Sequence, residues 1–290
     1  MFTGAMVALI TPFQDGEIDF QTLEELIEFQ LNNGIDAIVP VGTTGESPTL
    51  SHDEHKQLIE RIVKIVDGQT PVIAGAGSNS TAEAIELTAF AKKIGADATL
   101  QVTPYYNKPT QEGFYQHFKA IAEEVDLPIV LYNIPGRCGA GMTPDTIARL
   151  AEVENIVAIK EATGSLDQAS EIAIQCGITI ISGDDSLTLP LASVGGKGVI
   201  SVAANIVPAD VKAMTDLILE GDFASARQWH NKLFTLCKNM LTLATNPIPI
   251  KAAMAMLNMA PEELRLPMTP LEENKKAILK QTLRNYGLLE

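Results

Sequence analysis

The chain has 290 residues, of which 46% are hydrophobic and 5% aromatic, and its formal net charge is −15 at neutral pH. This charge argues against a nucleic-acid-binding protein and against a protein that binds an anionic membrane surface, since both need an excess of basic residues. It does not exclude a small anionic substrate, because a pocket can be locally positive inside an acidic protein.

The three cysteines, Cys138, Cys176 and Cys237, are widely spaced and form no CxxC pair. This pattern provides no disulfide framework and favours a reducing compartment. The first basic side chain is Lys56, so the N-terminal stretch lacks the early positive charge of a targeting peptide. No apolar run approaches the roughly 18 residues of a membrane span. We therefore expect a cytoplasmic protein that neither crosses a membrane nor binds nucleic acid.

Short apolar runs alternate with amphipathic stretches along the chain. The runs begin 20–36 residues apart, which is the spacing of consecutive βα units. They are apolar throughout rather than alternating, which is typical of a parallel sheet covered on both faces. The predicted strands span residues 5–10, 35–39, 71–75, 97–101, 128–132, 156–160, 178–182 and 198–202.

Helical patterns fill the intervals between these runs. Ser51 and Glu54 fit an S-x-x-E capping box at the start of one helix, and Ser80 and Glu83 repeat the pattern at the start of the next. Apolar residues at helical spacing define the buried faces. These residues are Leu23, Leu26, Ile27 and Leu31; Leu58, Ile59, Ile62, Val63 and Val66; and Leu87, Ala91 and Ile94.

Eight consecutive βα units favour a closed (β/α)₈ (TIM) barrel. The alternative is a doubly wound open sheet, which usually has fewer strands and often carries a glycine-rich fingerprint after the first strand. Here the first strand continues into Thr11-Pro12-Phe13 without such a fingerprint. We assign residues 1–222 to a catalytic barrel and residues 223–290 to a C-terminal helical region. That region is predicted to hold helices near 223–243, after Pro249, and near 270–286.

In a barrel of this kind the active site lies at the C-terminal ends of the strands. Lys160 closes an otherwise apolar run, and Tyr132 closes the run before it. An ammonium group buried in an apolar barrel mouth has a depressed pKa, and the neutral amine can form a Schiff base with a carbonyl compound. A neighbouring tyrosine could transfer protons during that reaction. The alternative is a lysine at the rim that reaches into water.

Two further strand ends carry polar residues. Thr43 and Thr44 lie between Gly42 and Gly45, where backbone N–H groups and hydroxyls could hold a carboxylate. An ordinary βα turn would have the same composition. Arg137 could bind a second carboxylate through two parallel hydrogen bonds, or it could be a solvated loop residue.

Other patterns in the sequence indicate no metal or nucleotide site. His52 and His55 lie three residues apart, whereas the zinc motif HExxH needs a spacing of four. The glycine-rich stretches at 75–80 and 195–198 lack the spacing of a dinucleotide fingerprint and of a Walker A loop, respectively.

Six segments at the predicted strand ends resemble those of one known family. They are GTTGES (42–47), TPYYNKP (103–109), YNIPGR (132–137), IKEAT (159–163), SGDD (182–185) and GVISV (198–202). Together and in this order they resemble the dihydrodipicolinate synthase family, part of the pyruvate-dependent class I aldolase superfamily. The resemblance covers essentially the whole chain.

The resemblance implies a lyase that condenses pyruvate with L-aspartate 4-semialdehyde to give 4-hydroxy-tetrahydrodipicolinate, the first committed step of lysine biosynthesis. Lys160 would form the Schiff base, and Tyr132 would transfer protons to and from it. Thr43 would connect Tyr132 to Tyr106, which in this family crosses from a neighbouring subunit. No metal or organic cofactor would be needed, since the lysine itself acts as the electron sink.

The family likeness also assigns residues that bind ligands. Thr44, helped by the backbone near Ile200 and by Gly183 of the SGDD segment, would hold pyruvate, and Arg137 would bind the carboxylate of the aldehyde. Members are usually homotetramers, built as dimers of dimers, and many are inhibited by L-lysine at a dimer interface. The positions that match the inhibitor site are Ser47, His52, His55, Asn79, Glu83 and Tyr105. Helix capping is an alternative role for Glu83.

Two other functions remain open on sequence grounds. An N-acetylneuraminate lyase or a 2-keto-3-deoxy sugar acid aldolase would keep the Schiff-base lysine but use another second substrate, and Arg137 argues against them. A non-catalytic barrel is disfavoured because a lysine, two tyrosines, two threonines and an arginine converge on one rim.

Overall fold

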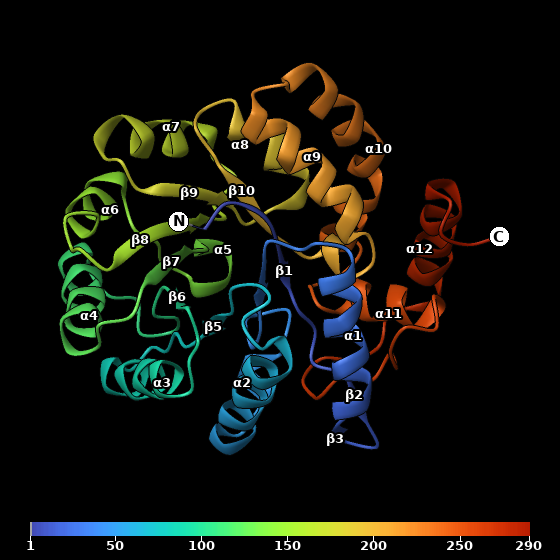
Figure 1. The fold of residues 1–290 in the computed structure, drawn as a ribbon, viewed down its shortest axis with the longest axis horizontal. Helices are drawn as coiled ribbons and strands as arrows, with labels where there is room; N and C mark the ends of the chain where they lie inside the picture. Colours follow the sequence, from blue (N-terminus) through green and yellow to red (C-terminus); the bar gives the residue numbers. More distant parts are fainter. Residues whose placement is uncertain (1) are drawn as a thin grey trace.

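The structure is a computed structural model that describes residues 2–290. Eight parallel strands form a barrel surrounded by a ring of helices (Figure 1), so the predicted (β/α)₈ fold is confirmed. Their order around the sheet is β4-β1-β10-β9-β8-β7-β6-β5. The strands are β1 (Gly4–Ala8), β4 (Ala37–Val39), β5 (Ile73–Gly75), β6 (Ala98–Val102), β7 (Ile129–Asn133), β8 (Ile156–Glu161), β9 (Thr179–Ser182) and β10 (Gly198–Ser201).

The barrel closes between β4 and β5. Ile38 and Val72 form a parallel bridge there, and the Ile38 N–H donates to the Pro71 carbonyl oxygen at 2.9 Å. The Gly75 N–H donates to the Pro40 carbonyl oxygen, also at 2.9 Å. A closed ring of strands excludes the open doubly wound sheet.

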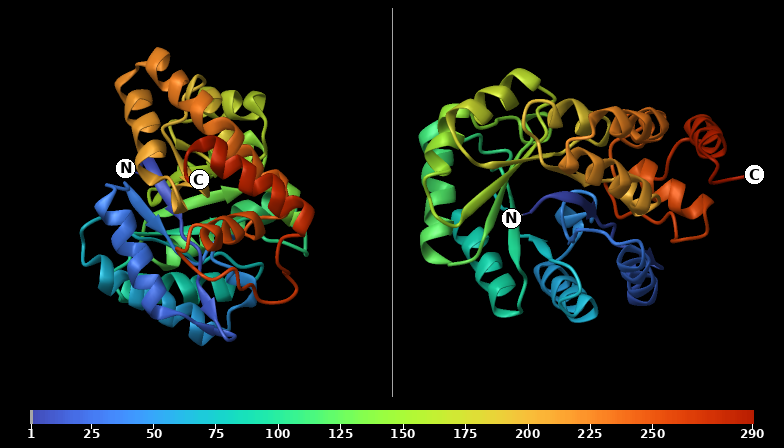
Figure 2. Two further views of the ribbon diagram at one scale, coloured as in Figure 1. Left: turned by 90° about the vertical axis from the view of Figure 1, so that its right-hand side faces the viewer. Right: turned by 45° about the horizontal axis from the view of Figure 1, so that its top comes forward.

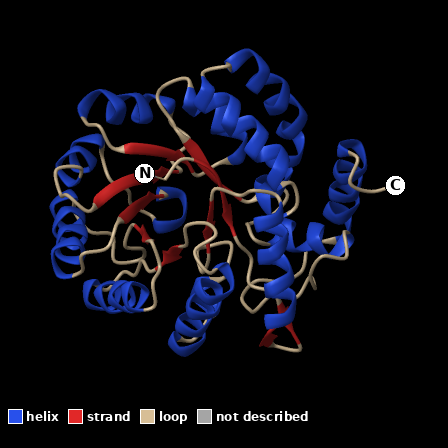
Figure 3. Cartoon of the chain, viewed as in Figure 1, coloured by secondary structure: helices blue, strands red, loops and turns tan. Residues whose placement is uncertain are grey.

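The helices alternate with the strands, as Figure 3 shows by colour. Those of the barrel are α1 (Phe20–Asn32), α2 (His52–Val66), α3 (Thr81–Lys93), α4 (Gln111–Glu124), α5 (Pro135–Cys138), α6 (Pro144–Leu150), α7 (Leu166–Gln175), α8 (Thr188–Ala192) and α9 (Pro208–Glu220). The C-terminal helices are α10 (Phe223–Thr242), α11 (Ile248–Met256) and α12 (Glu273–Tyr286), close to the predicted positions.

One of the two predicted capping boxes is present. At α2 the Glu54 N–H donates to Ser51 Oγ at 3.2 Å, and the Ser51 N–H donates to Glu54 Oε2 at 2.8 Å. The box predicted at α3 is wrong, because the Ser80 side chain makes no capping hydrogen bond. The Glu83 carboxylate instead accepts from the Ser78 hydroxyl and pairs with His52.

The strands are buried on both faces, as their uniform apolarity predicts. One apolar cluster fills the barrel and includes Met6, Val39, Val130, Ala158 and Ile200. Other clusters lie between the strands and the surrounding helices. The packed interior leaves the strand ends as the place where polar side chains can meet a ligand.

The C-terminal helices α11 and α12 lie outside the ring on one side of the barrel (Figures 1 and 2). Leu233 of α10 and Leu279 of α12 belong to the same apolar cluster as Leu23 of α1. The predicted boundary at 222/223 falls between α9 and α10, although the core is continuous across it. The division into two domains stays a prediction.

A short hairpin that we did not predict precedes α1. Its strands are β2 (Phe13–Gln14) and β3 (Glu17–Ile18), and Asp15 and Gly16 between them both have positive φ, 55° and 85°. Two-residue strands carry no periodic signal, but the Asp-Gly dipeptide is a strong hairpin signal.

Among the described residues, no helix combines the length and the apolarity that crossing a bilayer requires.

Candidate active site

Lys160 and Tyr132 lie side by side on neighbouring strands. They are partners in the register of β7 and β8. Lys160 Nζ lies 4.3 Å from the centroid of the Tyr132 ring. Both side chains are buried, with 6% and 5% of their surfaces exposed, so the rim-lysine alternative is wrong.

Burial lowers the pKa of Lys160 to about 8. The carboxylates of Asp184 and Asp185 act in the opposite direction, and the Arg137 guanidinium adds to the decrease. At pH 7, about one molecule in ten then carries a neutral amine, far more than at an ordinary lysine. The site therefore supplies a nucleophilic amine near neutral pH.

Burial raises the pKa of Tyr132 to about 12, with Arg137 and the Thr43 hydroxyl acting against the rise. The phenol is therefore protonated at neutral pH. A neutral phenol against an amine can donate a proton to an oxygen that leaves during condensation and can accept it again.

Two carboxyl groups of the SGDD segment lie beside the amine, and the sequence analysis assigned them no role. Burial raises the pKa of Asp184, whereas the nearby Lys160 lowers it. Asp185 is fully enclosed and accepts hydrogen bonds from the Ser201 hydroxyl and from the Val202 N–H, the latter at 2.9 Å. Asp185 thus joins the SGDD segment to the end of β10.

Asn246 connects two of the predicted binding residues. Its Nδ2 donates to Thr44 Oγ1 at 2.9 Å, and its carbonyl oxygen accepts from Arg137 Nη2 at 3.0 Å. The Asn246 Oδ1 atom is buried without a hydrogen-bond partner in the described part of the chain. This residue was not predicted, because nothing in the local pattern at 246 shows that it lies against the turn that carries Thr44.

The turn that carries Thr43 and Thr44 has a strained backbone. Val41 and Glu46 have φ angles of 54° and 55°, in the left-handed region that β-branched and bulky residues avoid. Each such residue costs about 1–3 kcal/mol, and this strain persists only where surrounding contacts enforce it. A Cβ atom on Gly75 would collide with the Val41 carbonyl group, so the glycine permits the close approach of β5.

A cavity of about 440 Å³ opens above this turn. Thr43, Tyr132 and Arg137 line it, so the structure brings together three of the predicted catalytic and binding residues from the ends of β4 and β7. Lys160 and Thr44 are not among the residues that line this cavity. Five of the six predicted effector residues line the same cavity: Ser47, His52, His55, Glu83 and Tyr105.

The predicted effector residues are connected to one another. His52 Nε2 lies 3.0 Å from Glu83 Oε1, and Asn79 Nδ2 donates to the Tyr105 carbonyl oxygen at 3.0 Å. His55 Nε2 is 2.7 Å from the Gly75 carbonyl oxygen, and burial lowers the pKa of His55. The capping role considered for Glu83 is wrong, since its carboxylate makes the contacts described above.

The cavity lining does not include the predicted residues Tyr106, Ile200 and Gly183. Tyr106 is 90% exposed and does not line the cavity of its own chain, so its catalytic role stays a prediction. Ile200 is fully buried opposite Met6. The Gly183 N–H donates to the Glu161 carbonyl oxygen at 2.8 Å, and a Cβ there would collide with Ala162. The substrate contacts of Ile200 and Gly183 also stay predictions.

No three His, Cys, Asp or Glu side chains in residues 2–290 are grouped so that they could hold a metal ion. The expectation that the reaction needs neither a metal nor an organic cofactor stays a prediction.

The sequence matches the profile of the Dihydrodipicolinate synthetase family over residues 1–286. The chain belongs to this family. Its relative from Syntrophobacter fumaroxidans, a 4-hydroxy-tetrahydrodipicolinate synthase, is 55% identical over 292 residues that cover 100% of both chains. Other curated relatives that match over the full length carry the same name, so the chain is an enzyme of the lyase class.

Solved structures agree with this assignment. The crystal structure of dihydrodipicolinate synthase from Aquifex aeolicus has a TM-score of 0.97 and 52% identity, and the match covers 99% of each chain. A synthase from Cyanidioschyzon merolae, solved with lysine bound, has a TM-score of 0.95 and 44% identity, again covering 99% of each chain.

Proposed function

We propose that this protein condenses pyruvate with L-aspartate 4-semialdehyde to form 4-hydroxy-tetrahydrodipicolinate, through a Schiff base at Lys160. The observation that carries the proposal is the buried amine of Lys160, whose pKa is about 8, lying against the protonated phenol of Tyr132. The family membership and the names of the full-length relatives support the choice of substrates.

The reaction begins when the neutral Lys160 amine attacks the keto carbon of pyruvate. Tyr132 protonates the oxygen, which leaves as water, and an imine remains. Loss of a methyl proton gives the enamine, whose carbon attacks the aldehyde of the second substrate. The amine of that substrate then displaces Lys160 and closes the ring. The lysine nitrogen serves as the electron sink, so no further cofactor enters these steps.

Each of the two substrates carries a carboxylate, and each carboxylate would have its own binding group. Thr44, with the backbone near Ile200 and Gly183, would hold the carboxylate of pyruvate. Arg137 at the cavity wall would bind the carboxylate of the aldehyde substrate through its planar guanidinium. Its bond to the Asn246 carbonyl group fixes the orientation of the side chain.

The active assembly is proposed to be a cytoplasmic homotetramer, a dimer of dimers. Tyr106 would reach from one subunit to Thr43 of the partner and complete a proton relay to Tyr132. Two observations support this arrangement: Tyr106 is 90% exposed, and its backbone has a φ of 71°, in the left-handed region.

L-Lysine is proposed as a feedback inhibitor that binds the predicted effector residues. The related synthase from Cyanidioschyzon merolae was solved with lysine bound. In this chain Glu83 and the Tyr105 hydroxyl could hold an ammonium group. Because the same cavity also contains Thr43 and Tyr132, an occupant there could influence the proton relay.

A coupled assay with pyruvate and different aldehydes tests the proposed activity. We expect turnover with L-aspartate 4-semialdehyde and little or none with sugar aldehydes such as N-acetylmannosamine. Preferred use of a sugar aldehyde would replace the proposal by the sugar acid aldolase alternative.

Arg137→Ala is expected to reduce turnover of L-aspartate 4-semialdehyde by about 10²-fold or more, since a bidentate charged contact is lost. Formation of the pyruvate imine should change far less. Pyruvate reacts with Lys160 before the aldehyde does, and Thr44 rather than Arg137 would hold its carboxylate. Steady-state kinetics and borohydride trapping with pyruvate measure the two effects. Equal loss of both would remove Arg137 from its assigned role.

Replacing His55 by Asn or Tyr105 by Phe is expected to weaken inhibition by L-lysine while most of the activity remains. Both side chains line the cavity, and Lys160 is not among its lining residues. Inhibition curves for each variant provide the measurement, with His230→Gln on α10 as a control away from the cavity. If the curves coincide with that of the unaltered enzyme, these residues do not belong to the effector site.

A further inference from the structure

A buried ion pair lies directly behind the turn that carries Thr43 and Thr44. It joins Glu46, the last residue of that turn, to Lys251 of α11, 205 positions later in the chain. The two side chains are 2% and 0% exposed. Lys251 Nζ also donates to the Glu263 carbonyl oxygen at 2.8 Å and lies 4.2 Å from the centroid of the Phe13 ring.

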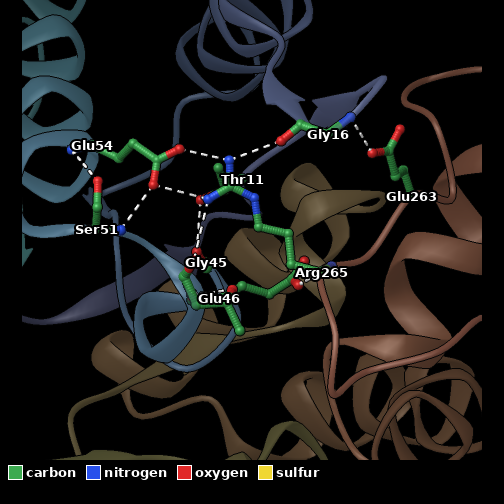
Figure 4. Close-up of polar contacts among 9 residues, drawn as sticks. Thr11, Gly16, Gly45, Glu46, Ser51, Glu54, Glu263 and Arg265 are labelled. Carbon is green, nitrogen blue, oxygen red and sulfur yellow. Dashed lines mark hydrogen bonds and ion pairs between the residues drawn. The ribbon is translucent and has the colours of Figure 1, made fainter.

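Arg265 holds the same turn from a second direction (Figure 4). Its backbone N–H donates to Glu46 Oε2 at 3.1 Å. Its guanidinium makes two bonds to the Glu54 carboxylate, of 2.9 and 2.6 Å, and one to the Gly16 carbonyl oxygen at 2.9 Å. Glu46, Glu54, Lys251 and Arg265 are called the Glu46 network below.

This network contacts a strained part of the site. The turn contains two residues with left-handed backbone, Val41 and Glu46, and neither is glycine. Thr11 Oγ1 donates to the Gly45 carbonyl oxygen at 2.7 Å, which fixes the turn from the side of β1. A strained backbone of this kind persists only where neighbouring groups enforce it.

Stability alone is a poor reason for such a pair. Desolvation of two charges consumes most of their mutual attraction, and apolar residues of similar volume often give equal or greater stability. A buried pair does, however, fix the position of the backbone that carries it. Here that backbone bears the two hydroxyls of the substrate-binding turn.

We propose that the Glu46 network is a positioning device that holds Thr43 and Thr44 in the geometry that binds the carboxylate of pyruvate. Glu46, Lys251 and Arg265 are positioning residues and touch no substrate. The inference rests on the proposed function, because pyruvate is the ligand whose binding it concerns.

The decisive variant removes both charges at once, Glu46→Gln with Lys251→Met. Either single change leaves one charge buried without a partner and is expected to lower the melting temperature. The double variant keeps the side-chain volumes and should melt within about 4 °C of the unaltered protein. The pyruvate concentration that half-saturates borohydride trapping at Lys160 should nevertheless rise about tenfold or more, since a small displacement of the turn weakens binding.

A control comes from a second lysine–carboxylate pair, which is partly exposed. Lys212 Nζ lies 2.9 Å from Asp36 Oδ1, and Asp36 precedes β4, at the end of that strand opposite to the turn at 42–46. Asp36→Asn with Lys212→Met should leave half-saturation by pyruvate unchanged. If the Glu46/Lys251 double variant does not fold, Arg265→Gln decides, because that side chain is partly exposed and the variant should fold. It loses the guanidinium bonds to Glu54 and Gly16 and keeps only the backbone bond to Glu46, so half-saturation by pyruvate should again rise.

The outcomes separate the inference from the function on which it rests. Failure of the unaltered enzyme to form any adduct with pyruvate would refute the proposed function. An adduct in the unaltered enzyme, together with the same half-saturation in a folded variant of the network, would overturn the inference alone. A variant of the network with normal stability and weakened pyruvate binding would support the inference.

Discussion

Replacing Lys160 by methionine is expected to lower kcat/KM by more than about 10⁴-fold, because the nucleophile of the reaction is removed. The methionine side chain fills a similar volume in the barrel mouth. The variant should fold, because methionine is uncharged. The unaltered protein bears the cost of burying an amine that can be protonated, and the variant does not. Steady-state kinetics measures the loss, and circular dichroism confirms the fold.

Lys238→Met on the exposed face of α10 is the control for this variant and should keep full activity. The expected loss is specific to a lysine whose amine forms a bond with the substrate. A Lys160→Met enzyme that retains more than about one hundredth of the activity would contradict the assigned role.

Tyr132→Phe is expected to reduce kcat by about 10²–10⁴-fold, the usual contribution of a positioned acid–base group. The ring that packs against the Lys160 amine remains, so the fold and the depressed lysine pKa should be preserved. Only the proton donor is lost. Because protons move both when the imine forms and when it breaks, single-turnover trapping with pyruvate should slow as well.

Tyr115→Phe on α4 is a suitable comparison, since that ring packs against Arg149 on the outside of the barrel. It should leave the kinetics unchanged. If Tyr132→Phe slows turnover no more than this control, proton transfer occurs through another group and the relay from Thr43 to Tyr132 is wrong.

Most of the barrel could be predicted from the sequence, because each strand is a compact apolar run and each βα unit repeats the spacing of the last. Lys160 and Tyr132 were found for the same reason: they are polar residues at the ends of apolar strands, and parallel strand ends share one rim. The hairpin of β2 and β3 escaped prediction, since two-residue strands have no measurable period.

Contacts between distant segments could not be predicted in this way. The Asn246 side chain reaches Thr44 across 202 positions, and Lys251 reaches Glu46 across 205. No local sequence pattern predicts either contact. Both depend on how the C-terminal region packs against the barrel mouth. The capping box expected at Ser80 failed for a related reason, because the Glu83 carboxylate is bound by Ser78 and by His52 from α2.

The central claim is that a buried, largely desolvated amine at Lys160 bonds covalently to pyruvate. Incubation with pyruvate and borohydride, followed by peptide mass spectrometry, tests this directly across a pH series. We predict one adduct, a carboxyethyl group on Lys160, with Lys251 unmodified, and a trapping rate that rises with pH and levels off above about 8 as the amine loses its proton. An unmodified Lys160 peptide, or a rate that still climbs towards pH 10, would contradict the account.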